Sequence, residues 1–306
     1  MRKERFDMKV MIFADYPGTC GVRSFPDGSG SQIIEIKRSA KIQQLNEINS
    51  CIDGLHDAGV DEILVWDNDP GDPDSSPLNV YSLRPGVYLA ESRDYAGPVA
   101  RVDASFDAAI HLGAWSMNHT PGGYMAHTLD DKMFDSVKIN GQFIGDIGIN
   151  ILRNSYFNVP TVLVSGDDKA CAEAAAFNGL PLETVAAKKG LSRHRSMNYS
   201  ATDVCAELRE KSCKAIRNLS GFKAKKLSPE GGYTAEIRLL SQNFLTIWTR
   251  MGYQPKDDNT VEIRSDDLLD LVAQLKSWHP GAHFKRYGLI PDAADFFTPA
   301  GLEDDL

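Results

Sequence analysis

Residues 9–18 read KVMIFADYPG and decide the fold class, because a short and continuously apolar run is followed at once by an acidic turn. A strand that is buried on both faces has this composition, and Asp-Tyr-Pro-Gly is a sequence that ends it. The pattern recurs at residues 62–67 (EILVWD), 108–113 (AAIHLG) and 161–168 (TVLVSGDD). Short buried strands that each end in a loop-forming sequence predict a parallel sheet.

Helix-forming segments alternate with these strands. The apolar residues at positions 42, 45, 48, 52 and 55 recur at helical spacing and predict a helix over about residues 34–59. Two further helices are predicted over residues 144–156 and 169–178. A short strand is predicted at residues 87–90. This alternation predicts a three-layer α/β/α fold with a mainly parallel sheet.

The pattern changes after about residue 190, where a smaller α+β portion is predicted. Its helices are expected over residues 201–218, 241–251 and 266–278, and its strands over 233–239 and 261–264. The resulting domain organisation is a tail at residues 1–7, an α/β domain at 8–190, the smaller α+β portion at 191–288 and an acidic tail at 289–306.

Composition narrows the class of protein. The chain has 306 residues and a net charge of −9 without a basic stripe, which argues against nucleic acid and anionic membranes as partners. It has no run of 18 apolar residues and no apolar secretion signal after its first residues, so we expect a cytoplasmic protein. The five cysteines have no C-x-x-C spacing, and the sequence carries no phosphate-binding glycine motif and no G-x-S-x-G.

Acidic residues follow the predicted strands. Asp15 follows the first strand, Asp67 and Asp69 follow the second, and Asp146 lies next to Gly145 at the start of a predicted helix. The carboxyl ends of parallel strands meet at one edge of a sheet, and converging carboxylates hold hard divalent ions. The alternative is that these residues are solvated caps and turns, which is the commoner role for a residue such as Asp67.

Histidines gather in residues 111–127, HLGAWSMNHTPGGYMAH. His127 follows a Pro-Gly-Gly turn, and a histidine on such a loop can act as a nucleophile, a general acid or base, or a metal ligand. His111 lies inside a predicted strand, where a hydrogen-bonded core histidine is the commoner interpretation. The spacing leaves the role of His119 open.

Six segments carry a family resemblance, and they are residues 9–15, 62–67, 109–113, 120–127, 139–150 and 159–168. In this order they resemble the zinc-dependent D-aminopeptidases of the DppA type over about residues 8–195. In that family an aspartate, two glutamates and two histidines hold two zinc ions, and a further histidine is the nucleophile or base. The resemblance also implies a ring-like homo-oligomer that encloses the active sites.

Two positions match the family pattern in this comparison. Asp15 matches the first zinc ligand, and His127 matches the catalytic histidine, although one residue is inserted between Gly113 and His127. His119 lies close to that insertion. It is a candidate to take the place of a zinc-binding histidine that the family has and this sequence lacks. It is also a second catalytic candidate.

The other four ligand positions depart from the family pattern. They carry Pro17, Asp69, Trp115 and Asp146, where the family has glutamate, histidine, histidine and glutamate. Proline and tryptophan offer no side-chain ligand to a metal. The remaining metal candidates, Asp15, Asp69 and Asp146, favour Mg²⁺, Mn²⁺ or a single Zn²⁺, or no stable metal.

Two functions remain open from the sequence. The first is a D-aminopeptidase-like amide hydrolase with an altered metal site, which acts on a small amine-containing amide or amino-acid derivative. Asp67, Trp115 and Asn150 are then the candidate substrate-binding residues. The alternative is a divergent enzyme with a non-hydrolytic reaction, or a non-catalytic small-molecule-binding relative. The presence of His127 after a glycine turn favours catalysis.

Overall fold

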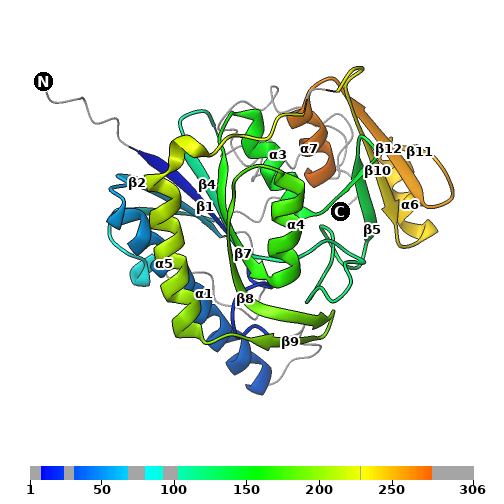
Figure 1. The fold of residues 1–306 in the computed structure, drawn as a ribbon. Coiled ribbons are helices and arrows are strands. Elements are labelled where there is room, and N and C mark those ends of the chain that lie inside the picture. The colour runs from blue at the N-terminus through cyan, green and yellow to red at the C-terminus, as the bar shows by residue number, and fades with distance from the viewer. Residues whose placement is uncertain (1–7, 24–30, 68–79, 92–102, 228, 278–306) are drawn as a thin grey trace, which may run out of the picture.

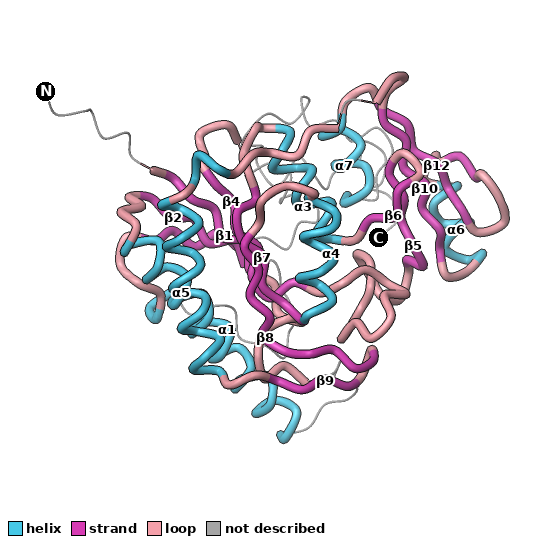
Figure 2. The backbone as a smooth tube through the Cα atoms, in the orientation of Figure 1, coloured by secondary structure: helices cyan, strands magenta, loops and turns pink. Residues whose placement is uncertain are grey.

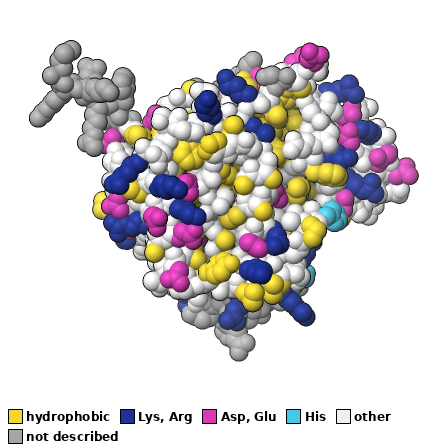
Figure 3. Space-filling view, viewed as in Figure 1, with side chains coloured by type: hydrophobic (Ala, Val, Ile, Leu, Met, Phe, Trp, Pro, Cys, Tyr) yellow, Lys and Arg dark blue, Asp and Glu magenta, His cyan; other side chains and the backbone are white. Residues whose placement is uncertain are grey.

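The computed structural model describes residues 8–23, 31–67, 80–91, 103–227 and 229–277. Asp69 and the two predicted tails, residues 1–7 and 289–306, therefore lie outside the described residues. Among the helices that are described, none is both long and apolar enough to cross a bilayer. Positive and negative side chains are intermixed on the face shown in Figure 3.

Sheet A is a seven-stranded sheet in the order β3-β2-β1-β4-β7-β8-β9. Neighbouring strands are parallel except β8 and β9, which are antiparallel. The prediction of a mainly parallel sheet is confirmed. The strands are β1 (Lys9–Ala14), β2 (Glu62–Asp67), β3 (Val87–Glu91), β4 (Ala108–Ala114), β7 (Thr161–Asp167), β8 (Glu183–Ser192) and β9 (Arg195–Asn198).

Helices cover both faces of sheet A (Figure 1). One face is covered by α1 (Ser31–Asp57) and α5 (Ala201–Arg217), and the other by α3 (Asp146–Tyr156) and α4 (Asp168–Asn178). Of the apolar α1 residues on which the prediction rests, Leu45, Ile48, Ile52 and Leu55 pack in the core at helical spacing, whereas Ile42 is exposed. The three-layer α/β/α architecture is therefore confirmed.

Sheet B is a five-stranded antiparallel sheet in the order β11-β12-β10-β5-β6, which lies beside α3 and α4 (Figure 2). It takes strands from both sides of residue 190, so the predicted domain boundary there does not separate the two sheets. The remaining elements are β5 (Phe134–Ile139), β6 (Gln142–Ile144), β10 (Tyr233–Leu239), β11 (Gln254–Pro255), β12 (Thr260–Ser265), α6 (Gln242–Arg250), α7 (Leu268–Ser277), η1 (Val80–Ser82) and η2 (Leu219–Gly221).

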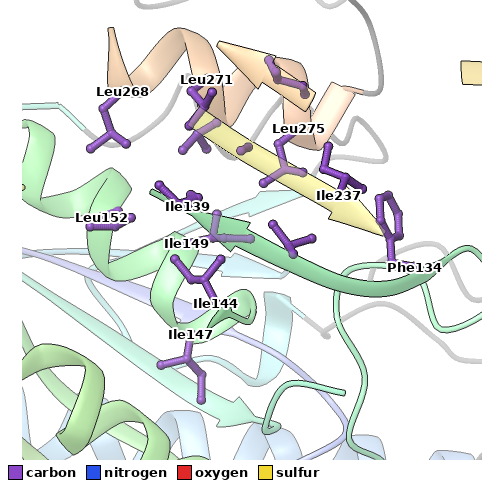
Figure 4. Packing of buried hydrophobic residues seen from close by; sticks show 14 of the residues in the cluster. Phe134, Ile139, Ile144, Ile147, Ile149, Leu152, Ile237, Leu268, Leu271 and Leu275 are labelled. Carbon is purple, nitrogen blue, oxygen red and sulfur yellow. The ribbon is translucent and has the colours of Figure 1, made fainter. Parts of the chain in front are cut away.

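A shared apolar core joins sheet B to α3 and α4, the helices that cover one face of sheet A. Figure 4 shows Leu275 of α7 beside Ile237 of sheet B, and Leu271 of α7 and Leu152 of α3 belong to the same buried cluster. All of these side chains are buried, and full burial of each contributes about 1.5–3 kcal/mol. This core fixes α3, which carries Asp146, between the two sheets.

The hairpin β5–β6 is an element that the sequence analysis did not predict. Asn140 and Gly141 connect the strands with φ angles of 50° and 79°, as a tight hairpin turn of Asn-Gly requires. Ile144, which the sequence assigns to a helix, is the last residue of β6, and the helix begins at Asp146.

Candidate functional site

Asp15 lies at the carboxyl end of β1 and is almost completely buried. Its backbone N–H donates to the Leu112 carbonyl at 2.8 Å, and Gly18 donates to the Gly113 carbonyl at 2.8 Å. Gly113 has φ +68°, and a Cβ at that position would overlap the Asp15 carbonyl oxygen. The ends of β1 and β4 are therefore locked together by a glycine that no other residue replaces without strain.

His111 of β4 pairs with Asp15. Its Nε2 lies 2.5 Å from Asp15 Oδ2, and its ring stands nearly perpendicular to the ring of Phe13, with centroids 5.3 Å apart. Both side chains are buried, and His111 Nδ1 has no hydrogen-bond partner among the described residues. His111 is thus a buried core residue, as expected, but its partner is the carboxylate of the candidate site.

Arg153 of α3 places a buried positive charge beside this pair. The guanidinium carbon lies 4.8 Å from the centre of the Phe13 ring. Burial lowers the pKa of Arg153 to about 9, and the negative charge of Asp15 opposes that shift. A buried charge needs a compensating partner, so Asp15, His111 and Arg153 form one internal charge cluster.

The rings of Trp115 and His127 are stacked. Their centroids are 4.4 Å apart and their planes lie within 5° of parallel. Trp115 Nε1 donates to the His127 carbonyl at 3.0 Å, and His127 Nδ1 lies 2.7 Å from the Met125 carbonyl. A carbonyl only accepts, so Nδ1 carries a proton and the neutral ring has its lone pair on Nε2. This is the form that can act as a base or nucleophile.

Three carboxylates anchor the loop that carries His127. Each accepts a hydrogen bond from a backbone N–H of residues 117–129, at 2.7–2.8 Å. Burial raises the pKa of Glu173 to about 7. Asp146, a predicted metal ligand, is therefore also a support of the loop that carries His127. The pairs are Glu173 with Met117, Asp167 with Tyr124, and Asp146 with Leu129.

Asp67 faces a lysine in the interior. Lys41 Nζ lies 3.9 Å from Asp67 Oδ1, and both side chains are buried. The same ammonium group lies 5.3 Å from the centre of the Tyr16 ring, and Gln44 Nε2 donates to the Asp15 carbonyl at 3.0 Å. These contacts place Asp67 beside the segment that follows β1.

A second buried lysine holds the loop after Asp15. Lys188 Nζ donates to the carbonyls of Pro17 and Val22 at 3.2 and 3.3 Å. Glu47 accepts from the Cys20 N–H at 2.8 Å. Burial lowers the pKa of Lys188 to about 8 and raises that of Glu47 to about 7. Pro17 thus belongs to a fixed loop, and Lys188 and Glu47 are supports that the sequence analysis missed.

Asn150 and His119 have contrasting environments. Asn150 is buried on α3, one turn after Asp146, and both of its amide atoms lack a hydrogen-bond partner among the described residues. His119 has a largely exposed side chain, and its Nε2 lies 2.8 Å from Asp135 Oδ1. Asn150 therefore has an unused donor and acceptor in the interior, whereas His119 pairs at the surface.

The described residues do not fit the two-zinc centre that the family resemblance implies. Pro17 and Trp115 supply no ligand, and one oxygen of Asp15 contacts His111. Within the described ranges, no three His, Cys, Asp or Glu side chains are grouped so that they could hold a metal ion. Asp69 is the predicted ligand whose position is not described.

Comparisons with known proteins agree with this fold. A family model described as D-aminopeptidase matches residues 8–277. A D-aminopeptidase of Bacillus subtilis (strain 168) is 30% identical over 230 residues, which cover 72% of this chain and 78% of the relative. The solved Zn-dependent D-aminopeptidase DppA from Bacillus subtilis, described as a self-compartmentalizing protease, superposes with a TM-score of 0.74 at 26% identity, covering 90% of this chain and 99% of that one. The chain therefore belongs to the D-aminopeptidase family, whose members are hydrolases.

Proposed function

We propose that this chain hydrolyses a small amine-containing amide or amino-acid derivative, with His127 as the catalytic group. The observation that carries the proposal is the fixed ring of His127. Trp115 stacks against it and the Met125 carbonyl binds its Nδ1, so its Nε2 carries the lone pair in the neutral form. The family assignment supports hydrolysis as the reaction.

His127 would act at the scissile amide in one of two ways. As a base, Nε2 takes a proton from water while the water oxygen attacks the carbonyl carbon. As a nucleophile, Nε2 attacks that carbon itself, and water later releases the acyl group. In both routes the C–N bond breaks, the leaving nitrogen takes a proton, and the products are a carboxylic acid and an amine.

The metal site is proposed to be altered. Asp15, Asp69 and Asp146 are the carboxylates that would hold Mg²⁺, Mn²⁺ or a single Zn²⁺, and the alternative is a site without a stable metal. The buried Arg153 guanidinium already supplies a positive charge near Asp15, which reduces the need for a second cation there.

The candidate substrate contacts come from α3 and the end of β4. Asn150 would hydrogen-bond to the substrate with its amide, and Trp115 would form an apolar wall. Asp67 would contribute to substrate binding through its buried ion pair with Lys41. His119 stays a second catalytic candidate, at a more exposed position.

The assembly and location are proposals as well. The zinc-dependent relative is described as a self-compartmentalizing protease, and by analogy we propose that this chain forms a homo-oligomer. The substrate is a small molecule and the expected location is the cytoplasm, with neither nucleic acid nor membrane as a partner.

A panel of D- and L-amino-acid amides and dipeptides tests the proposed reaction. The purified protein is incubated with each compound, with and without added Zn²⁺, Mg²⁺ or Mn²⁺, and released amino acid is measured by mass spectrometry. Release that disappears in His127→Ala supports the proposal. Tight binding of a compound without release would contradict it and favour the non-hydrolytic alternative.

A further inference from the structure

The side chain of Lys188 lies between two loops of the candidate site and is completely buried. Its ammonium group donates to the carbonyls of Pro17 and Val22, at 3.2 and 3.3 Å, and so holds the loop that follows β1. The same group lies 4.8 Å from the centre of the Tyr124 ring, which belongs to the loop that carries His127. One buried charge therefore contacts both loops.

Tyr124 connects the same two loops through its own hydrogen bonds. Its hydroxyl donates to the Val22 carbonyl at 3.2 Å, and this is the carbonyl that Lys188 also binds. A carbonyl oxygen has two lone pairs, so it accepts from both groups. The Tyr124 backbone N–H donates to Asp167 Oδ2 at 2.7 Å, which fixes the other end of the residue. The ammonium group and the phenol thus form one buried junction between the loops.

The strand that carries Lys188 also reaches the ring of His127. Arg193 directly follows the last residue of β8, and its carbonyl accepts from the Met125 N–H at 2.9 Å. The Met125 carbonyl in turn lies 2.7 Å from His127 Nδ1. Met125 has a φ of 51°, and this left-handed conformation is costly for a residue other than glycine, so its surroundings must hold it in place. A shift of β8 therefore changes the direction of the His127 ring.

Carboxylates from two other elements compensate the buried charge. Burial lowers the pKa of Lys188 to about 8, and the negative charges of Glu47 on α1 and Asp167 on β7 oppose that shift. Glu47 also accepts from the N–H of Cys20, in the loop after β1, at 2.8 Å. Desolvation of a buried ammonium group offsets much of what its partners return, so such a group adds little net stability. Its main effect here is to fix the directions of the groups around it.

We propose that Lys188 is a positioning residue that sets the place of His127 relative to Asp15. The inference rests on the proposed function, in which His127 acts on the scissile amide. With Lys188 present, the loop after β1 and the loop of His127 contact one buried group and keep a fixed separation. Without it, the Pro17 carbonyl loses this donor and the two loops can shift, which misplaces His127. Lys188 itself does not touch the substrate.

Lys189 provides a matched control, because it is the next residue of β8 and its side chain is exposed. Lys188→Met removes the buried ammonium group, and Lys189→Met removes the same charge at the surface. On the best amide of the panel, we expect Lys188→Met to lower kcat by about tenfold or more, with KM changed by less than about twofold. Lys189→Met should leave both constants within about twofold of wild type. Added to His127→Ala, Lys188→Met should cause no further loss, since Lys188 acts through His127.

A measurement on the histidine itself keeps the test independent of turnover. The histidine rings are isotope-labelled, and the ring-nitrogen NMR signals of His127 are assigned by their loss in His127→Asn. We expect Lys188→Met to move these signals, whereas Lys189→Met leaves them in place. If no compound of the panel is hydrolysed, the proposed function fails, and the signals alone still decide the role of Lys188.

Three results would overturn the inference. The first is a set of His127 signals that stays in place in Lys188→Met, or that moves equally in Lys189→Met. The second is a rise in KM at unchanged kcat. The third concerns folding, which circular dichroism measures. Should Lys188→Met not fold, Lys188→Gln, which keeps a neutral donor, takes its place with the same expected results. Loss of folding in both variants would show that Lys188 is a structural residue only.

Discussion

The indole of Trp115 lies flat against the imidazole of His127, with ring centroids 4.4 Å apart. The same indole donates a hydrogen bond to the His127 carbonyl, so one side chain holds both the ring and the backbone of the histidine. The family resemblance predicts a metal ligand at position 115. The structure thus places a packing residue where a metal donor is expected, directly beside the candidate catalytic group.

His127→Ala is expected to lower turnover by at least about 10²-fold, because positioned proton transfer is typically worth about 10²–10⁴ in rate. His127→Asn should be nearly as inactive, since an amide does not exchange a proton near neutral pH. The measurement is kcat on the best amide of the panel, with circular dichroism to show that the fold is intact. Wild-type turnover in either variant would move catalysis to another residue, with His119 the next candidate.

Substitution of Trp115 separates positioning from substrate contact. Trp115→Ala removes the stacking and the Nε1 hydrogen bond, and we expect kcat to fall by up to about 10²-fold because His127 is misplaced. Trp115→Phe keeps a stacking ring and should lose about tenfold or less. Steady-state kinetics decide between the roles, since a rise in KM at unchanged kcat would show that Trp115 only contacts substrate.

Gly113→Ala is expected to destabilise the protein by about 2–4 kcal/mol, because it combines a left-handed backbone with an overlap on the Asp15 carbonyl. Gly221→Ala is the control, since a Cβ there meets nothing within 4 Å. Urea unfolding measures both. A Gly113→Ala variant as stable as the control would show that the ends of β1 and β4 are not locked as described.

Glu47 should make stability depend on pH. Burial raises its pKa from 4.5 to about 7, so between these values the folded state keeps a proton that the unfolded chain has released. The free energy of unfolding therefore falls as pH rises through this range, by up to about 3 kcal/mol. Glu47→Gln should make the fall smaller by the contribution of Glu47 and leave that of Glu173, whose pKa burial also raises to about 7. The more exposed Glu207→Gln is the control for the lost charge. The free energy of unfolding is measured by urea at several pH values. The same dependence on pH in wild type and in Glu47→Gln would contradict this prediction.

The sequence predicts five of the seven strands of sheet A because the signals of those strands are local, whereas β8 and β9 are not predicted. The structure has β1 at Lys9–Ala14, as the apolar run predicts, and β10 of sheet B at Tyr233–Leu239, where a strand is also predicted. The hairpin of β5 and β6 was missed, although its Asn140-Gly141 turn is a recognised hairpin signal. Its pairing with β10 joins segments far apart in the chain, and no local pattern indicates that.

The candidate site is predictable only in part, for the same reason. Asp15 and His127 stand out by their positions after a strand and a turn. His111 becomes the partner of Asp15 only through the register that pairs Phe13 with His111. In the sequence, Arg153 has no feature that distinguishes it from other helix residues. In the structure α3 packs on sheet A, and the guanidinium group of Arg153 is buried. Side chains brought together by tertiary packing leave no signature in a single sequence.

Metal analysis of the purified protein tests the central claim, that a D-aminopeptidase fold here carries an altered site around Asp15 in place of a two-zinc centre. Protein purified without chelator and without added metal is analysed by plasma mass spectrometry, as wild type and as Asp15→Asn. The account predicts fewer than two equivalents of zinc in wild type. Two tightly bound equivalents in wild type that are lost in Asp15→Asn would contradict it.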